Sequence, residues 1–403
     1  MPSAMPPTTS DSLDLTNLPD CKSSTLELVL ATTEEWEACS HINGASWSGP
    51  LSFEAYLRRE KHLSSQPLTK DGGITVWILV DSSDKHNPRR ILSACETIKK
   101  PALVAYRGDS VEDTIAHSIG SVFCRPEYRG KGYAGKMMHE LGKKLEKWQQ
   151  SEGKKGTFNV LYSDIGKVFY ARDGWMPFPA SHISLPPASS RTAQKRMGVE
   201  QLYDGDLEGL CKLDEQQLRR EVGTFPANGP NMRVAFVPSA ETLRWHHSRE
   251  EFVAKEILGR IPEVKGAVVY TSSGKKVWCV WTRAFSQKVD ESVFYILRLV
   301  VEDEGHVNPN SIGRASAHSV QDDKVEAVEA CLRAAQQEAY NWNMSTIDIW
   351  NPSDTVVAAA KRILPSVNII NRENESIPCL KLYGSLAEEG SVEWIANEKF
   401  GWS

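Results

Sequence analysis

Residues 114–148 constrain the fold more than any other part of this sequence, because they join a strand pattern to a helix pattern through a glycine-rich turn. The strand-like run ends at Cys124, five polar residues follow, and an amphipathic helix begins after Gly132. Gly130 and Gly132 lack side chains, so consecutive backbone N–H groups can converge on an anion at the helix N-terminus, where the helix dipole strengthens the attraction. Positive charge comes from three nearby side chains: Arg129, Lys131 and Lys136. The segment therefore predicts a phosphate-binding turn.

Other interpretations of this turn fit the residues less well. Gly130, Gly132 and Gly135 formally match the GxGxxG fingerprint of dinucleotide-binding folds, but that fingerprint follows its strand directly, whereas RPEYR intervenes here. A P-loop requires GxxxxGK followed by Ser or Thr, and Met137 stands at that place. A glycine-bearing turn that binds no ligand stays open as an alternative.

The hydrophobic pattern divides the 403 residues into two halves with a similar order of elements. In the first half we predict strands at 26–30, 74–80, 91–98, 114–124, 158–163 and 180–186, and helices at about 33–44, 52–64, 134–148 and 165–174. Thr32 and Glu35 form a capping box before the first helix. In the second half we predict strands at 266–270, 276–285, 294–302, 345–350 and 377–384, and helices at 206–222, 322–342 and 353–363. A linker rich in Pro, Ser and Ala at 186–194 separates the halves. We therefore expect an α/β (α+β) protein with a disordered leader (1–22), a first domain (23–190) and a similarly folded second domain (191–403).

Composition limits the class of partner. The chain has 47 Lys and Arg against 52 Asp and Glu, a net charge of −5, which argues against a nucleic-acid partner. No apolar run approaches the roughly 18 residues of a membrane helix, and the N-terminal residues lack the pattern of a signal peptide. The eight cysteines form no CxxC pair, and no histidine cluster has metal-ligand spacing. We expect a cytoplasmic protein without a metal ion and without a nucleic-acid or membrane partner.

Two short motifs resemble those of a known superfamily. The run Arg129-Gly130-Lys131-Gly132-Tyr133-Ala134 fits the Arg/Gln-x-x-Gly-x-Gly/Ala pattern of the acetyl-CoA loop in GNAT N-acetyltransferases. The run IGKVFYARDGW at 165–175 resembles the xLYxxxGF segment of the same superfamily. The resemblance covers about residues 26–186 and implies a GNAT-like mixed, mostly antiparallel sheet flanked by helices.

The resemblance implies a site for acetyl-CoA. Beside the strand that ends near Cys124, a gap in the sheet would leave main-chain groups to pair with the pantetheine arm, and the amides of residues 129–135 would bind the pyrophosphate. Ser163 stands where the superfamily usually has Asn, which weakens the contact expected there. The cofactor-binding residues implied are Val122, Phe123, Cys124, Arg129, Gly130, Lys131, Gly132, Tyr133, Ala134, Gly135, Ser163 and Gly166.

Direct transfer of an acetyl group to an amine needs a base and an acid. An alkyl ammonium with a pKa of about 10.4 must lose a proton before it attacks, and the departing thiolate benefits from a proton donor. Tyr170 matches the superfamily's tyrosine beside the thioester sulfur, with a core aromatic residue as the alternative. Four candidates for the base stay open beside a purely structural role for each: Glu96, His117, the pair His246 and His247, and a C-terminal carboxylate on Ser403, as in some two-domain relatives.

The second half has the expected order of elements without the expected chemistry. Between its third strand and its long helix, residues 303–321 contain no Arg-x-x-Gly-x-Gly/Ala pattern. Tyr170 stands seven residues after Ser163, and Ala358 stands seven residues after Asn351, which occupies the matching place. We therefore expect a degenerate GNAT-like domain that binds no CoA and shapes the pocket for the amine.

The combination of RGKGYAGKMM, WHHSREEF and EWIANEKFGW is similar to the fungal lysine N6-acetyltransferase family. That resemblance implies transfer of an acetyl group to the side-chain amine of free L-lysine, in lysine catabolism, by a monomer or weak dimer. A free amino acid needs an arginine for its carboxylate, and Arg249, Arg283 and Arg298 are available. The substrate-binding candidates are His246, His247 and Arg249.

Two alternatives to this function stay open. In the first alternative, the enzyme is an acetyltransferase whose acceptor is another amine: a polyamine, an aminoglycoside-like amine, or a protein lysine or N-terminus. Otherwise the protein is a CoA-binding scaffold without catalytic activity, although the intact glycine-rich turn and Tyr170 count against that.

Overall fold

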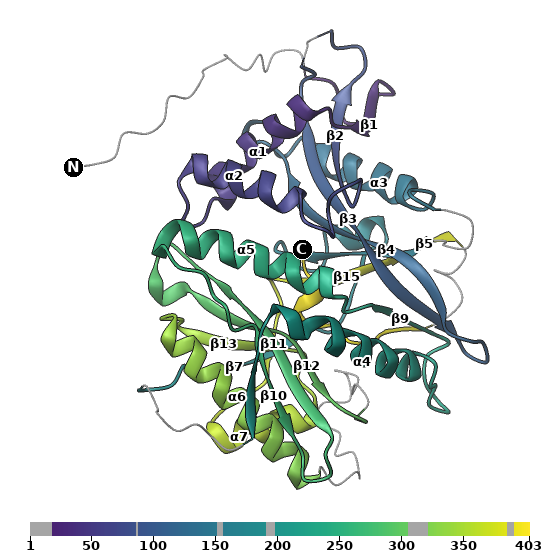
Figure 1. Ribbon diagram of the computed structural model, residues 1–403. Helices are drawn as coiled ribbons and strands as arrows, with labels where there is room; N and C mark the ends of the chain where they lie inside the picture. The colour runs from purple at the N-terminus through teal and green to yellow at the C-terminus, as the bar shows by residue number, and fades with distance from the viewer. Residues whose placement is uncertain (1–17, 86–87, 151–155, 191–197, 305–320, 385–390) are drawn as a thin grey trace.

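A computed structural model describes residues 18–85, 88–150, 156–190, 198–304, 321–384 and 391–403. Two mixed, mostly antiparallel sheets, each flanked by helices, make up the molecule, and the last residue lies between them (Figure 1). The first sheet has nine strands and the second has seven. This arrangement confirms the predicted fold class.

The first sheet is built mainly from the first half of the chain. Its strands lie in the order β1 (Leu26–Leu30), β2 (Ile74–Asp81), β3 (Ser93–Tyr106), β4 (Glu112–Phe123), β5 (Gly156–Ser163), β15 (Ile377–Leu382) and β6 (Met176–Pro177). Two further strands extend it, because β9 (Met232–Phe236) pairs with the far end of β3 and β16 (Val392–Trp394) pairs with β9. Helices α1 (Thr33–Trp47) and α2 (Phe53–Ser64) lie over one face of this sheet and α3 (Tyr133–Leu145) over the other. The predicted capping box of α1 is confirmed, since the Thr32 amide donates to Glu35 (2.9 Å) and the Glu35 amide donates to the Thr32 hydroxyl (3.3 Å).

The second sheet repeats much of this plan. Its strands lie in the order β14 (Ile370–Asn371), β7 (Ser181–Leu185), β13 (Thr346–Trp350), β12 (Val293–Val301), β11 (Lys276–Ala284), β10 (Gly266–Tyr270) and β8 (Val199–Leu202). Four helices accompany it: α4 (Asp204–Val222), α5 (Ala240–Leu258), α6 (Asp322–Asn341) and α7 (Asp354–Ile363). Within the described ranges, no helix is long and apolar enough to cross a membrane.

Each half completes the sheet of the other, which corrects one expectation. The sequence places 180–186 as the last strand of the first half, yet β7 lies between β13 and β14, with Ile183 opposite Ile349. In exchange, β15 from the second half lies between β5 and β6, with Cys379 opposite Leu161. Apolar alternation identifies a strand but not the sheet that accepts it, because pairing depends on distant residues. The domain boundary near residue 190 stays a prediction.

The short helix predicted at 165–174 is smaller than expected. The structure has a 3-10 turn there, η2 (Tyr170–Asp173), and the residues before it form a loop. A glycine with positive φ, Gly174 (φ 90°), ends the turn, since few other residues adopt that conformation without strain.

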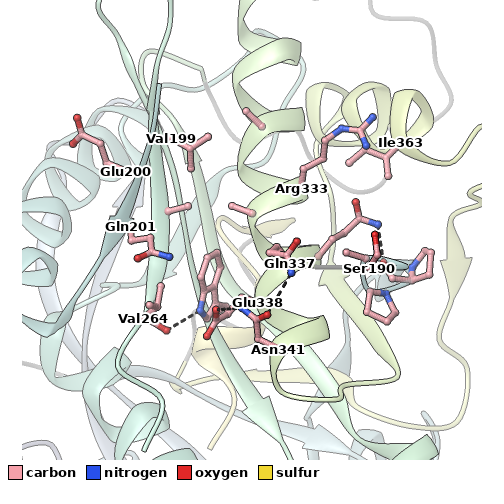
Figure 2. A pocket seen from close by; sticks show the side chains of 18 of the residues that line it. Ser190, Val199, Glu200, Gln201, Val264, Arg333, Gln337, Glu338, Asn341 and Ile363 are labelled. Carbon is pink, nitrogen blue, oxygen red and sulfur yellow. Dashed lines mark hydrogen bonds between the residues drawn. The ribbon is translucent and has the colours of Figure 1, made fainter. Parts of the chain in front are cut away.

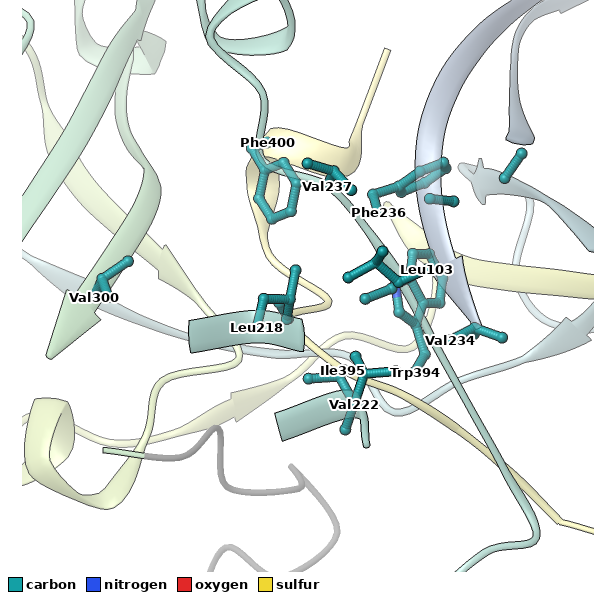
Figure 3. Close-up of a cluster of buried hydrophobic side chains, with 14 of the residues drawn as sticks. Leu103, Leu218, Val222, Val234, Phe236, Val237, Val300, Trp394, Ile395 and Phe400 are labelled. Atoms are coloured by element: carbon teal, nitrogen blue, oxygen red, sulfur yellow. The ribbon is translucent and has the colours of Figure 1, made fainter. Parts of the chain in front are cut away.

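A shared hydrophobic core joins the two halves (Figure 3). It contains Leu103 of β3, Leu218 of α4, Phe236 of β9, Val300 of β12 and Phe400 of the C-terminal segment (residues 391–403), all at most 1% exposed. Each such side chain contributes about 1.5–3 kcal/mol by leaving water. The C-terminal segment is therefore part of the core rather than an appendage.

Candidate functional site

The turn before α3 has the geometry that its sequence predicts. Gly130 (φ 76°) and Gly132 (φ 88°) are left-handed, and Gly132 is the N-cap of α3, which has no side-chain cap on its first N–H groups. A Cβ added at Gly130 or Gly135 would meet nothing within 4 Å, so the main chain is open there. The Arg129 side chain folds back and donates from Nε to the Cys124 carbonyl (3.1 Å). An open helix N-terminus with basic neighbours can bind an anion such as a pyrophosphate.

Residues 18–22, which the sequence assigns to the leader, lie against this turn, whereas residues 1–17 lie outside the described residues. The Tyr133 hydroxyl donates to the Pro19 carbonyl at 2.6 Å. A Cβ on Gly132 would lie 2.8 Å from the Cys21 sulfur. The turn is thus supported from the N-terminal side, and its second glycine has no room for a side chain.

A gap opens in the sheet directly before this turn, as the resemblance implies. The parallel pairing of β4 with β5 ends at Ile119 and Leu161, although β4 continues to Phe123 and β5 to Ser163. On its other side, β4 forms a bulge against β3, and Ser121 there has a φ of 51°. Main-chain groups of residues 120–123 therefore face the gap without a partner in β5.

Tyr170 is buried in the hydrophobic core between the first sheet and α3. It packs in the same hydrophobic cluster as Ile119 and Leu161, the last paired residues of the two strands. Its hydroxyl makes no hydrogen bond with another described residue, and burial raises the pKa of the phenol above its ordinary value. A phenol that stays protonated and has no internal partner can donate a proton.

Ser163 is used within the loop that follows β5. Its hydroxyl donates to the Gly166 carbonyl (2.7 Å) and accepts from the Ile165 amide (3.2 Å). Gly166 has a φ of 76° and donates its N–H to the Asn374 carbonyl at 3.1 Å. The serine that replaces the usual asparagine therefore shapes its own turn.

Glu96 lies on β3 directly opposite Gly120, at the edge of the β4 bulge. Its side chain is half-buried, and burial raises the pKa of its carboxyl to about 7, with the nearby Glu60 carboxylate adding to the shift. The Ser121 hydroxyl and the Arg59 guanidinium oppose the shift. A carboxyl with such a pKa can accept a proton near neutral pH.

Ser403 lies on the same face as Glu96. Its hydroxyl is 2.6 Å from the Ser118 hydroxyl, and its main-chain oxygen is 3.2 Å from where a Cβ on Gly120 would stand. The buried Lys100 ammonium holds this part of the chain by donating to the Gly401 carbonyl at 2.9 Å. Gly120 thus contacts both candidate bases, since Glu96 is its cross-strand partner.

The histidines are placed differently. His117 projects to the opposite face of the sheet, because its neighbour Ser118 faces Ser403, and its Nε2 donates to the Gln149 amide oxygen (3.1 Å). Burial lowers the pKa of His117 to about 4. His246 is buried behind the C-terminal segment and donates to the Phe400 carbonyl (3.1 Å), while His247 donates to the Trp281 carbonyl (3.0 Å). Burial also lowers the pKa of both rings.

The structure distinguishes the three arginines that were candidates for binding a substrate carboxylate. Arg283 is buried in ion pairs with Glu250 (3.0 Å) and Glu338 (2.6 Å), and Arg298 is buried against Asp214 (2.6 Å) and Glu398. Arg249 on α5 is half-buried and forms no salt bridge with another described residue. Its Cζ lies 5.4 Å from the centre of the Trp402 ring, and burial, with help from the Arg59 charge, lowers its pKa to about 10. Of the three, Arg249 is the one available to a ligand.

Several site features were not predicted from the sequence. The Ser121 bulge and the Lys100 contact with the C-terminal segment are among them. Gly120, an isolated glycine within a strand pattern, is a signal for a bulge or a close approach of main chain. Lys100 had no such signal, because its partner lies 301 residues away.

A large cavity of about 920 Å³ lies elsewhere, in the second half. Figure 2 shows Arg333 and Gln337 of α6 on one side of it and Val199 and Gln201 of β8 on the other. Two of its charged side chains already have partners in the protein: Arg333 pairs with Glu329, and Glu338 with Arg283 and Trp342. The candidate site is better placed at the end of β4, where the sheet has its gap and the helix N-terminus is open. No cluster of three or more metal-ligating side chains occurs among the described residues.

Comparison with known proteins agrees with this architecture. The family model of the LYC1 GNAT-like C-terminal domain matches residues 182–403. A lysine acetyltransferase of Yarrowia lipolytica is 22% identical, with 90% of this chain and 95% of the relative covered. An uncharacterized protein of Saccharomyces cerevisiae is 25% identical over 54% of this chain and 62% of its own length.

A solved structure supports the same fold. The GCN5-related N-acetyltransferase from Anabaena variabilis superposes with a TM-score of 0.51 at 13% identity, covering 90% of this chain and 74% of that one. The fold agrees with the family match, which spans more than half of the sequence. The chain belongs to the LYC1 GNAT-like family and is an acetyltransferase of the GNAT type.

Proposed function

We propose that this enzyme transfers the acetyl group of acetyl-CoA directly to the side-chain amine of free L-lysine, in cytoplasmic lysine catabolism, as a monomer or weak dimer. One observation carries the proposal. A gap in the sheet, an open helix N-terminus and a carboxyl with a pKa of about 7 all lie at the end of one strand, β4. The name of the Yarrowia lipolytica relative, a lysine acetyltransferase, supports lysine as the acceptor.

The proposed cofactor contacts follow the open main chain. Residues 122–124 would pair with the amides of the pantetheine arm in the gap, and the N–H groups of residues 129–135 would hold the pyrophosphate. Arg129 and Lys131 would add charge attraction at this end. The Ser163 hydroxyl would add little, because it already bonds within its own loop.

The proton steps are assigned to two side chains. Glu96 accepts a proton from the lysine ammonium, and the free amine forms a C–N bond with the acetyl carbonyl carbon. The C–S bond breaks, its electron pair goes to sulfur, and Tyr170 donates a proton to the thiolate. The nitrogen loses two protons in all, of which one leaves through Glu96 to solvent and one replaces the proton given by Tyr170. The net products are N6-acetyl-lysine, the CoA thiol and one proton.

A carboxylate on Ser403 is the second candidate for the base. It is supported by the contact with Gly120, which also lies opposite Glu96. The two candidates differ in a pH profile. If Glu96 is the base, Glu96→Gln removes the rise of kcat/KM near pH 7 and deletion of Ser403 leaves it in place; the opposite pattern assigns the proton transfer to Ser403.

The acceptor is tested by measuring CoA thiol release with free lysine, spermidine and a lysine-containing peptide. We expect turnover with lysine and much slower reaction with the other two. Reaction with the peptide alone, or with spermidine alone, would contradict the proposed substrate. Thermal stabilisation by acetyl-CoA without turnover on any amine would favour the non-catalytic scaffold.

A further inference from the structure

Three positive charges and two indole rings alternate at the junction of the two halves. The Cζ of Arg249 lies 5.4 Å from the ring centre of Trp402, and Lys399 Nζ lies 3.9 Å from the same ring. Lys399 Nζ is also 4.3 Å from the ring of Trp350, and the Cζ of Arg372 is 4.1 Å from that ring. We call these five residues the cation ladder. It runs from α5 through the C-terminal segment and the end of β13 to the residue after β14.

The ladder lacks the counter-charges that the other buried arginines have. Arg283 and Arg298 each bind two carboxylates, whereas Arg249, Lys399 and Arg372 form no salt bridge within the described residues. Burial lowers the pKa of Lys399, and the charges of Arg249 and Arg372 lower it further. Because a buried charge is costly unless it is paired, an anion bound next to these three side chains would be stabilised.

Two acidic residues near the ladder accept hydrogen bonds from other parts of the chain. Two carboxylates, Asp164 and Asp348, lie near enough to raise the pKa of Lys399, so three cations face two acids. These acids accept hydrogen bonds elsewhere, Asp164 from the Ser376 amide (2.9 Å) and Asp348 from the Ser184 hydroxyl (2.8 Å).

Arg249 is the member of the ladder that faces the proposed site of reaction. Its ring partner Trp402 precedes Ser403, whose main-chain oxygen lies 3.2 Å from where a Cβ on Gly120 would stand, and Gly120 is the cross-strand partner of Glu96. Arg59 and Glu60 of α2 pair with each other at 2.6 Å and largely cancel. A half-buried guanidinium that forms no salt bridge with another described residue offers two parallel N–H donors to a carboxylate.

We propose that Arg249, supported by the charges of Lys399 and Arg372, binds the α-carboxylate of the amino acid whose side-chain amine reaches Glu96. This inference deepens the proposed function and rests on it for the position of the amine. It makes the acceptor a free amino acid, because a polyamine has no carboxylate and a lysine within a protein has an amide in its place. Arg249 is a specificity-determining residue in this view, and the C-terminal segment contributes Trp402 and Lys399 to acceptor recognition.

The test compares L-lysine with cadaverine, which is lysine without its carboxylate, in the full-length enzyme. For Arg249→Met we expect kcat/KM for lysine to fall about 100-fold, mainly through KM, while that for cadaverine changes by less than about threefold. Arg249→Lys should retain part of the lysine activity, since it keeps the charge and loses the bidentate geometry. Arg58→Met is the matched control, because Arg58 of α2 pairs with Glu256 of α5, the helix of Arg249, at an exposed position.

A binding measurement separates this inference from the proposed reaction. L-Norleucine has the α-carboxylate and no side-chain amine, so calorimetric titration reports the carboxylate site without turnover. Binding to the wild type that is lost in Arg249→Met supports the inference even if lysine is not acetylated, an outcome that would contradict the proposed function alone. The inference is overturned if norleucine does not bind the wild type, or if Arg249→Met weakens lysine and cadaverine turnover equally.

Discussion

The two halves of the molecule contain the same gap and treat it in opposite ways. In the first half, pairing of β4 with β5 ends at Ile119 and Leu161; in the second half, pairing of β12 with β13 ends at Ile296 and Ile349. Both β4 and β12 run on for several residues, and both carry a bulge against the strand on their other side. The shared geometry makes the halves copies of one plan.

In the second half, the protein fills the gap itself. Glu398 of the C-terminal segment accepts from the Leu299 amide at 3.1 Å, and the Gln217 amide donates to the Val301 carbonyl at 3.1 Å. Arg298 and Asp214 complete the buried network around Glu398. Unpaired strand groups must find partners, and here side chains supply them. The corresponding groups at residues 120–123 have no such side-chain cover in the described chain, which is what a ligand-binding half requires.

The largest effect is expected from a change of Glu96, at the edge of the gap in the first half. The described part of the second half has no counterpart of this residue. Glu96→Gln should lower kcat/KM for lysine by about 100- to 10,000-fold, because the ammonium loses its proton acceptor. The deprotonated carboxyl is the active form, so wild-type kcat/KM should rise with pH through about 7, and the variant should lack this rise. Steady-state rates between pH 5.5 and 9 with about micromolar to millimolar lysine measure both.

Stability serves as the control for that variant. Burial raises the native pKa of Glu96 above its ordinary value of 4.5, so ionising the carboxyl disfavours the folded state progressively as the pH rises from about 4.5 to about 7. The neutral glutamine avoids this cost, and the variant should be at least as stable as the wild type at pH 8. If the Glu96→Gln variant kept the wild-type rate and the wild-type pH profile, Glu96 would not be the base.

The second largest effect is expected on stability, from a change of Glu398, which fills the gap in the second half. Glu398→Ala leaves the Arg298 guanidinium with one carboxylate and the Leu299 amide without an acceptor, which should cost about 3–5 kcal/mol of unfolding free energy. Urea unfolding measures this loss. At temperatures where the variant remains folded, its affinity for acetyl-CoA should stay near that of the wild type, since we expect the cofactor in the gap of the first half only. A loss of acetyl-CoA affinity with unchanged stability would reverse the roles of the two gaps.

Local patterns predicted the elements of both halves, and contacts between distant residues decided the rest. The Thr32–Glu35 capping box and the glycine turn before α3 involve residues a few positions apart, so the sequence was sufficient for them. The exchange of β7 and β15 was missed because a strand's alternation does not name its partner. The absence of a cofactor loop from the second half was predicted from residues 303–321. Most of these lie outside the described residues, so this stays a prediction.

The candidate site shows the same division. Tyr170 and the main chain of residues 129–135 follow from short motifs. The choice of Arg249 over Arg283 and Arg298 could not be made from the sequence, because it depends on partners that lie 33 to 100 residues from the latter two in the chain. The substrate-binding role of His246 stays a prediction, and its contact with Phe400, 154 residues away, could not be predicted either.

A smaller effect is expected from the acid. Tyr170→Phe should reduce kcat about 10- to 100-fold and leave the KM for acetyl-CoA nearly unchanged, because a thiolate with a conjugate pKa of about 8.5 already leaves readily. Burial without an internal hydrogen bond makes the loss of the hydroxyl inexpensive for folding. Pre-steady-state release of the CoA thiol reports the chemical step directly. An unchanged single-turnover rate would leave Tyr170 as a core aromatic.

The smallest effect is expected from restoring the missing tyrosine to the second half. Ala358 lies on α7 at the place that corresponds to Tyr170 and is half-buried, so Ala358→Tyr should change kcat by less than about twofold. The double variant Tyr170→Phe/Ala358→Tyr is the informative measurement. Its kcat should be as low as that of Tyr170→Phe alone. A phenol beside a gap that Glu398 already occupies has no thiolate to protonate. Recovery of the wild-type rate in the double variant would mean that the second half still binds the cofactor, and the contrast between an open and a filled gap would then be wrong.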